Sequence, residues 1–415
     1  MLPLHAQALV GAPAATKIRL SLLASAMCDA LGGPAEFYAR FSFPFIAHME
    51  PNDNFHLPPG VWTDDTSMAL ALARSIATSA YGFDEADQLD AYFRWWDAGE
   101  LSATGVCFDI GNTIQRALVL YMQELGSMGQ EHGGIPSQQA GESMRDSSPS
   151  GRMKCAQAAL RKIARDLKAP VFGGNGSLMR VLPVGLAYWR SDLLEVADLA
   201  KRSSVTTHPN PVCAEACAVW SQCIALVMQN ATVENGMMTK LDVLHHFASF
   251  KYSTPALEQA LSSIPPPASE SRAPADLEAH YKMHHPIARL AEEMQQAAAE
   301  CGPASVDLKS QILAILPEPS VLPSSGYVVH TLCAALYAFL ATSTFESGAL
   351  LVTNMGDDAD TVAAVYGGLA GVWYASDGDH TDGLFWTPLV REWMDVLVKK
   401  DLLETVAEEL IQFQN

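Results

Sequence analysis

Apolar residues recur along most of this chain at the spacing of helices, and no stretch alternates apolar and polar residues as a half-buried strand does. We therefore predict an all-α fold. The expected helices cover residues 18–31, 66–80, 85–97, 109–125, 153–167, 176–189, 192–202, 210–229, 239–249, 307–316, 326–342 and 358–375, with two more in 384–412. Within 358–375, Ala363, Gly367 and Gly371 recur every four residues, which predicts that another helix packs closely against this one.

Two segments interrupt the helical pattern. Residues 125–152 are rich in Gly, Ser, Gln and Met without an apolar period, and residues 263–300 begin with a proline-rich break before an acidic, helix-like stretch at 276–300. Because neither segment has a core of its own, we predict a single domain over residues 17–415 with two insertions. Residues 1–16 are expected to form a loose leader.

Composition limits the partners. The formal net charge of −20 argues against a nucleic-acid or anionic-membrane surface, so a phosphate ligand would be met by metal ions, backbone N–H groups or a few arginines. The eight cysteines form no CxxC pair, and Cys213 and Cys217 share a helix face rather than a metal site. No signal peptide and no uninterrupted apolar run of membrane-spanning length is evident, so an intracellular, soluble protein with reduced thiols is expected.

The segment Thr63-Asp64-Asp65-Thr66 stands at the start of an apolar helix. One such side chain suffices to cap a helix, because its oxygen accepts an unpaired backbone N–H. Four adjacent oxygen ligands exceed that need and suit a hard cation such as Mg²⁺ or Mn²⁺. From this segment alone, a metal site and a helix N-cap with more oxygen atoms than capping requires are equally good interpretations.

A second acidic segment, Asp357-Asp358-Ala359-Asp360-Thr361, precedes another apolar helix about 300 residues later. The two segments could meet across one site and hold two cations. Without metal, so many adjacent carboxylates would force some to stay protonated, because like charges repel. The pairing therefore favours a metal site, and the spacing excludes an EF-hand calcium loop.

Three further segments offer ligand contacts. The run Phe172-Gly173-Gly174-Asn175-Gly176-Ser177 can present bare N–H groups to a phosphate, and Phe172 could stack on a base. His208 precedes a proline and should lie on a loop, as a structural residue or as a contact to a ribose or phosphate. Asp109 is either the N-cap of its helix or a carboxylate that faces a substrate.

Together these segments resemble the ADP-ribosylglycohydrolase family, and residues 60–76 look most like its dinitrogenase reductase-activating glycohydrolase branch. The matching pieces occur in the family's order at residues 29–37, 62–70, 108–112, 174–180, 206–208 and 356–361. One departure is Cys28, which precedes Asp29 where the family usually has glycine.

The resemblance implies a compact orthogonal bundle of helices with a binuclear Mg²⁺ or Mn²⁺ centre at the base of an ADP-ribose cleft. It implies six metal ligands: Thr63, Asp64, Asp65, Asp358, Asp360 and Thr361. Glu36 would be the acidic residue near the metals, and Asp109 and Asn112 would face the scissile bond. The diphosphate would lie along Gly174, Asn175, Gly176 and Ser177, with His208 beside it.

The activity expected from the resemblance is hydrolysis of the N-glycosidic bond that joins ADP-ribose to arginine on a protein, by a monomer. Glu36 or Asp109 would act as general acid or base, with the division of roles left open. The alternatives are cleavage of ADP-ribosyl-serine or poly(ADP-ribose), a catalytically silent ADP-ribose-binding module, and a two-metal phosphohydrolase.

Overall fold

The computed structural model describes residues 2–131, 148–231, 238–266, 273–300, 307–376 and 383–413. In these residues the regular structure is helical, apart from three isolated β-bridges, which confirms the predicted all-α class. The α-helices are α1 (Ala14–Gly32), α2 (Asp64–Thr78), α3 (Glu85–Ala98), α4 (Asn112–Glu131), α6 (Pro149–Asp166), α7 (Leu182–Ala187), α8 (Leu193–Val205), α9 (Pro211–Ala231), α10 (Lys240–Ser249), α11 (Pro255–Leu261), α12 (Pro274–His284), α13 (Pro286–Glu300), α14 (Leu308–Ala314), α15 (Val328–Ala341), α16 (Phe345–Thr353), α17 (Ala359–Tyr374), α18 (Pro388–Val396) and α19 (Lys400–Phe413). Short 3₁₀ helices are η1 (Leu4–Ala6), η2 (Gly33–Ala35) and η3 (Pro170–Phe172).

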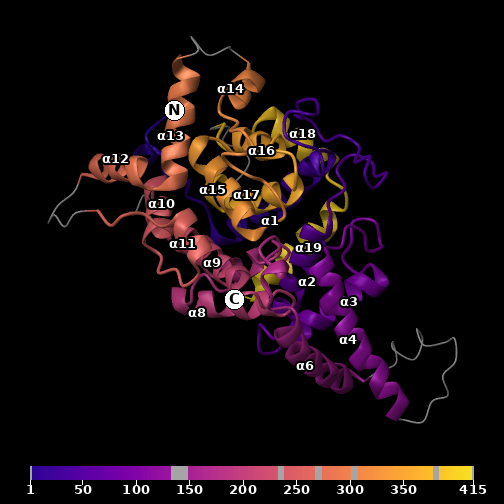
Figure 1. Cartoon of the computed structure of the whole chain (residues 1–415). Helices are drawn as coiled ribbons and strands as arrows, with labels where there is room; N and C mark the ends of the chain where they lie inside the picture. The colour runs from indigo at the N-terminus through magenta and orange to yellow at the C-terminus, as the bar shows by residue number, and fades with distance from the viewer. Residues whose placement is uncertain are drawn as a thin grey trace.

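The centre of the molecule is the contact between α1 and α17, with α15 and α16 packed on α17 (Figure 1). A Cβ on Gly367 would lie 2.5 Å from the Ala24 carbonyl oxygen, and one on Gly371 would lie 2.6 Å from the Ser21 Cα. The Ser21 hydroxyl donates across the contact to the Gly368 carbonyl at 2.8 Å. The predicted role of the small residues in this helix is confirmed, since larger side chains would force the two helices apart.

Helix α9 is, among the described residues, long and apolar enough to cross a membrane by length and composition. Its apolar window is 78% buried inside the protein, where α9 packs against α7, α8, α15 and α17. Helix α9 is therefore apolar because it is a core helix of this protein.

Several helix boundaries differ from those predicted. The helix expected over 176–189 is reduced to α7, because residues 174–181 form turns around a glycine-rich loop and Pro183 starts the helix. The stretch 276–300 is divided into α12 and α13 at His285, since the residue before a proline avoids helical geometry. Helices α11 and α16 were not predicted; both are shorter than ten residues, too short for a clear apolar period.

The N-terminal residues are attached to the body rather than loose, so the predicted leader is wrong over the described part of 1–16. Leu4 is buried, and the backbone N–H groups of Leu4 and His5 each donate to the Glu278 carboxylate at 3.0 Å. An isolated bridge joins Ala8 to Thr239. These hydrogen bonds involve a distant helix, which is why local sequence did not reveal them.

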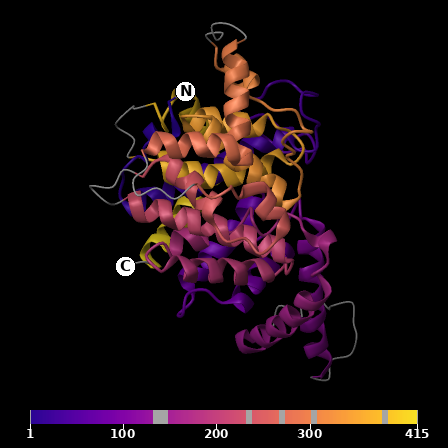
Figure 2. The ribbon, with the colours of Figure 1, turned by 60° about the vertical axis from the view of Figure 1, so that its left-hand side comes forward.

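The two predicted insertions have different outcomes. In 125–152, the described ends belong to α4 and α6, a pair that projects from the body, and residues 132–147 lie outside the described residues (Figures 1 and 2). In 263–300, α12 and α13 add to the core, because Tyr281 and Ile287 are buried. A single domain over 17–415 stays a proposal, supported by α1, which packs against both α17 and α19.

Candidate active site

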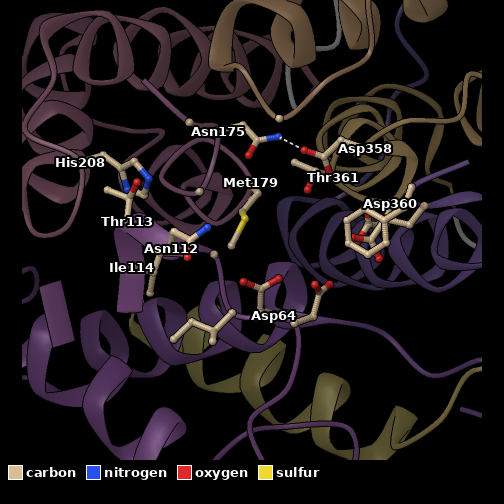
Figure 3. A pocket seen from close by; sticks show the side chains of 18 residues that line it. Asp64, Asn112, Thr113, Ile114, Asn175, Met179, His208, Asp358, Asp360 and Thr361 are labelled. Carbon is tan, nitrogen blue, oxygen red and sulfur yellow. Dashed lines mark hydrogen bonds between the residues drawn. The ribbon is translucent and has the colours of Figure 1, made fainter. Parts of the chain in front are cut away.

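The N-terminal ends of α2, α4 and α17 meet around a cavity of about 460 Å³ (Figure 3). Partial positive charge at helix N-termini stabilises carboxylates placed there. The predicted site residues that line this cavity are Glu36, Asp64, Asp109, Asn112, Gly174, Asn175, Gly176, His208, Asp358, Asp360 and Thr361. Residues not predicted also line it: Phe37, Ile110, Gly111, Thr113, Ile114, Met179 and Gly326.

Asp29 in α1 caps the start of α2. Its carboxylate accepts the Thr63 N–H at 2.9 Å, the Thr66 N–H at 3.1 Å and the Thr66 hydroxyl at 2.6 Å. The Thr63 side chain also accepts the Asp65 N–H at 3.4 Å. Asp29 and Thr63 therefore perform the capping that the sequence would have allowed Asp64 and Asp65 to perform.

The two acidic segments are in contact. The Thr361 hydroxyl donates to Asp65 Oδ1 at 3.2 Å, and the Thr63 hydroxyl donates to Asp360 Oδ2 at 3.5 Å. Gly32 makes the approach possible, because a Cβ there would lie 2.6 Å from the Asp360 Cα. The close packing of α1 against the start of α17 thus brings the distant segments to one place.

Glu36 and Asp109 approach the same point on loops. The Glu36 loop is paired with the second acidic segment, since the Phe37 N–H donates to the Asp357 carbonyl at 2.7 Å and the Asp357 N–H donates to the Tyr38 carbonyl at 2.8 Å. Carboxylate oxygens of Glu36, Asp109 and Asp360 lie within 4.8 Å of one another. Asp109 precedes α4 by three residues, so the alternative in which it is the helix N-cap is wrong.

Three carboxylate oxygens here are buried without a hydrogen-bond partner among the described residues: Glu36 Oε2, Asp65 Oδ2 and Asp360 Oδ1. A second group, formed by Asp29, Asp65 and Asp360, also has carboxylate oxygens within 4.8 Å of one another. A buried, unpaired carboxylate oxygen is unfavourable unless a proton or cation meets it. The residues therefore fit hard divalent cations such as Mg²⁺ or Mn²⁺.

The pKa values of these carboxyl groups, in the absence of a cation, also support a cation site. Burial, with the charges of Asp109, Asp358 and Asp29, raises the pKa of Glu36 to about 10. Burial, with Asp29 and Asp358, raises the pKa of Asp109 to about 8. Burial and neighbouring carboxylates raise the pKa of three more groups well above the ordinary range: Asp64, Asp65 and Asp360. A cation bound here would lower these pKa values, because positive charge favours the ionised form of a carboxyl group.

The glycine-rich loop forms the part of the wall next to Asp358. The Asn175 amide donates to Asp358 Oδ2 at 2.7 Å (Figure 3). It also donates to the Thr331 hydroxyl at 2.8 Å. Among the described residues, no acceptor pairs with the backbone N–H groups of Gly174 and Gly176, and both glycines line the cavity. From α9, the Cys213 thiol donates to the Gly174 carbonyl at 3.3 Å. Two N–H groups are thus available to an anion.

Some predicted residues lie outside the cavity wall. Ser177 is buried and accepts the Ser204 hydroxyl at 2.8 Å, so it supports the loop from behind. Phe172 lines a neighbouring hollow, where the Arg116 guanidinium lies 5.4 Å from its ring centre. Thr63 and Asp65 are buried beneath the cavity surface.

His208 lines the cavity and is neutral. Its Nδ1 lies 2.8 Å from the Thr207 hydroxyl, and burial followed by the Arg180 charge lowers its pKa to about 3. Asp29 was the main omission from the predicted site; the signal was its place before two glycines at the end of a helix. Nothing in the local sequence distinguished Phe37 or Met179.

The sequence profile of ADP-ribosylglycohydrolase matches residues 12–414. The chain belongs to the ADP-ribosylglycohydrolase family. The profile covers both acidic segments and the glycine-rich loop, so the cavity is that of a family of glycohydrolases that act on ADP-ribosylated substrates.

Similar proteins support the assignment. The ADP-ribosylarginine hydrolases Tri1 of Pseudomonas putida (strain GB-1) and Serratia proteamaculans (strain 568) are each 27% identical, over 94% and 95% of this chain and 76% and 78% of their own lengths. The ADP-ribosyl-[dinitrogen reductase] glycohydrolase of Rhodospirillum rubrum is 24% identical, over 86% of this chain and 85% of its own. A solved ADP-ribosylglycohydrolase-related protein complex contains a chain with a TM-score of 0.57 and 27% identity, matched over 97% of this chain and 99% of that one.

Proposed function

We propose that this chain hydrolyses the N-glycosidic bond between ADP-ribose and arginine on modified proteins. One observation carries the proposal: Glu36 and Asp360, which have unpaired carboxylate oxygens, line the same cavity as Gly174 and Gly176, whose backbone N–H groups have no acceptor among the described residues. A carboxylate cluster that can hold cations and backbone N–H groups that can accept an anion suit the two parts of an ADP-ribosyl group. The names of two relatives support arginine as the attachment point.

Six residues are proposed to hold two divalent cations: Thr63, Asp64, Asp65, Asp358, Asp360 and Thr361. Cations held by these residues would supply Lewis-acid chemistry and lower the pKa of a water molecule beside them. Asn175 keeps the Asp358 carboxylate turned toward the cavity by its hydrogen bond at 2.7 Å. Gly174 and Gly176 would bind the diphosphate through backbone N–H groups, with the neutral His208 beside it.

Proton transfer is assigned to the pair Glu36 and Asp109. Both line the cavity, and a guanidine leaving group needs a proton as the bond breaks. A carboxyl group beside the scissile bond can donate a proton to the leaving group or accept one from the attacking water, as in other glycoside cleavages. Asn112, in the first turn of α4, is proposed to bind the reacting end of the substrate beside them.

We further propose that the protein is an intracellular monomer that binds neither nucleic acid nor membranes. The net charge of −20 supports the absence of polyanion partners. The described cysteines are all free thiols, which supports a reducing compartment.

The test is release of ADP-ribose from arginine-modified and serine-modified peptides, followed side by side by mass spectrometry with Mg²⁺ or Mn²⁺. We expect release from the arginine peptide, abolished by a chelator. Faster release from the serine peptide would assign the O-glycosidic activity instead. Tight ADP-ribose binding without any release would identify a silent reader, and free phosphate from ADP-ribose 1″-phosphate would identify a phosphohydrolase.

A further inference from the structure

A line of three aromatic side chains, which we call the aromatic rim, begins at the cavity with Phe37 and continues through Phe55 to Phe108. The ring centres of Phe37 and Phe55 lie 6.3 Å apart, and those of Phe55 and Phe108 lie 5.6 Å apart. Phe37 lines the cavity and is 67% exposed, whereas Phe55 and Phe108 are half-buried. Phe37 and Phe55 lie 18 residues apart in the long connection between η2 and α2, and Phe108 lies in the connection between α3 and α4, so no helix or strand periodicity places the rings together.

The rim adjoins the two residues assigned to proton transfer. Phe37 directly follows Glu36, and Phe108 directly precedes Asp109. The loop that carries Phe55 is fixed to the same place, because the Asn54 amide donates to the Glu36 carbonyl at 2.9 Å. A group that contacts Phe37 from inside the cavity is therefore close to Glu36 and Asp109, which line the same cavity.

The backbone that holds Phe37 outward is strained. Its φ angle is 66°, a left-handed value that is a genuine outlier for a bulky residue. The pair of backbone hydrogen bonds with Asp357 maintains this conformation. Exposing a phenyl ring in this way buries little apolar surface, so the core does not account for the strain, and strained residues of this kind cluster at ligand sites.

The side chains around the aromatic rim indicate which chemical group would bind to it. Among the described residues that line the cavity, none is a lysine or arginine, so the side chains here favour a cation over an anion. Ring faces carry negative potential and attract guanidinium groups, which also stack on them as flat surfaces. Aromatic faces beside two carboxylates thus complement the guanidino group of arginine in both charge and shape.

We propose that the aromatic rim, with Phe37 as its exposed member, binds the guanidino group of the modified arginine and so gives the enzyme its preference for arginine over serine. The proposal rests on the proposed function, because it assigns the part of the substrate that lies beyond the ADP-ribose. A serine linkage has no planar cation to offer the rings. These rings are specificity-determining residues rather than catalytic ones.

The test compares Phe37→Ala, Phe37→Leu and Phe37→Tyr on an ADP-ribosylarginine peptide. Phe37→Ala is expected to raise KM about 5- to 30-fold, with a smaller effect on kcat, since a cation–π contact is lost. Phe37→Tyr keeps a ring and should restore most of the affinity, whereas Phe37→Leu keeps apolar area without a ring and should not. Binding of ADP-ribose by calorimetry should stay within about twofold of wild type in all three.

Phe41→Ala is the matched control. Phe41 is also exposed, at 53%, with the same φ of 66°, but it does not line the cavity. The proposal is overturned if Phe37→Ala and Phe41→Ala have equal effects, if Phe37→Leu restores affinity, or if Phe37→Ala weakens ADP-ribose as much as the peptide. A wild-type enzyme that releases nothing from the arginine peptide would overturn the proposed function, and the ligand assigned to the rim with it. If the wild-type enzyme is active and Phe37→Ala has the same KM, only the role proposed for the aromatic rim is overturned.

Discussion

The Asn175 amide donates to the Asp358 carboxylate at 2.7 Å and joins the glycine-rich loop to the second acidic segment, 183 residues away. The same amide donates to Thr331 in α15, so its position is fixed from two sides. The wall proposed to bind diphosphate and the residues proposed to bind metal are thereby held at a set distance. Movement of the loop would turn the Asp358 carboxylate.

Asn175→Ala is therefore expected to weaken metal binding. Loss of a partner that orients a ligand typically lowers metal affinity about 10- to 100-fold. Titration of the metal-free protein with Mn²⁺, followed by calorimetry, measures the change. Asn230→Ala is the control, since it removes a side-chain amide bonded to the Leu226 carbonyl in α9 and lies outside the cavity lining. Equal Mn²⁺ affinity in both variants would contradict the positioning role.

Asp360→Asn should have opposite effects on activity and on the stability of the metal-free protein. The variant loses a proposed ligand, so turnover is expected to fall at least about 100-fold. With chelator at about pH 8, we expect the free energy of unfolding to rise by about 1 kcal/mol, because asparagine replaces a carboxyl group that must take up a proton to be buried among other carboxylates. Urea denaturation measures the second effect. Asp53→Asn, at an exposed position, should change neither quantity.

The stability of the metal-free protein should fall as pH rises. The pKa of Glu36 is raised from 4.5 to about 10 and that of Asp109 from 3.8 to about 8, so between these limits the folded state binds more protons than the unfolded state. Deprotonation therefore favours unfolding across this window. Melting temperatures recorded with chelator should decrease from about pH 5 to about pH 9, and the gain on adding Mg²⁺ should grow over the same range. A gain from Mg²⁺ that shrinks as pH rises would contradict this linkage.

Asp29→Asn tests the assignment of Asp29 as a cap. The two oxygens of Asp29 accept bonds from Thr63 and Thr66, and an amide would point N–H groups at some of these donors. We expect a loss of about 2–3 kcal/mol in the free energy of unfolding, measured by urea denaturation with chelator. Asp192→Asn is the control, because Asp192 is an N-cap facing solvent on α8, where asparagine caps equally well.

Gly176→Ala should lower the affinity for ADP-ribose. A Cβ there would lie 2.9 Å from both His208 Cε1 and Ile114 Cδ1, so these cavity-lining side chains would have to move. Overpacking of this kind costs about 1–3 kcal/mol, so ADP-ribose binding by calorimetry should weaken about tenfold or more. Gly11→Ala, where the nearest atom is the Ala231 carbonyl oxygen at 3.8 Å, should leave binding unchanged.

Much of the fold was accessible from sequence because helix periodicity and helix ends are local properties. The apolar period and the small residues Gly367 and Gly371 predicted a helix that another helix approaches closely, and α1 does so. The prediction over 176–189 was wrong because the turns at 174–181 depend on pairing with residues 326–328 and on thiols from α9. The loose leader was wrong for the same reason, since Glu278 holds residues 4 and 5.

The sequence by itself determined the helical class and that Thr63–Thr66 and Asp357–Thr361 each begin a helix with more oxygen ligands than a cap requires. Only the tertiary structure decided which of these oxygens were left for a cation. Asp29 takes over the capping of α2, and one oxygen of Asp65 in that helix remains unpaired. One oxygen of Asp360, at the start of α17, is also without a partner among the described residues. Tertiary contacts also turned Phe37 outward beside Glu36, at a φ that its own sequence disfavours. Local propensity sets where helices start, whereas the direction of a side chain on a loop depends on hydrogen bonds made by residues far away in the chain.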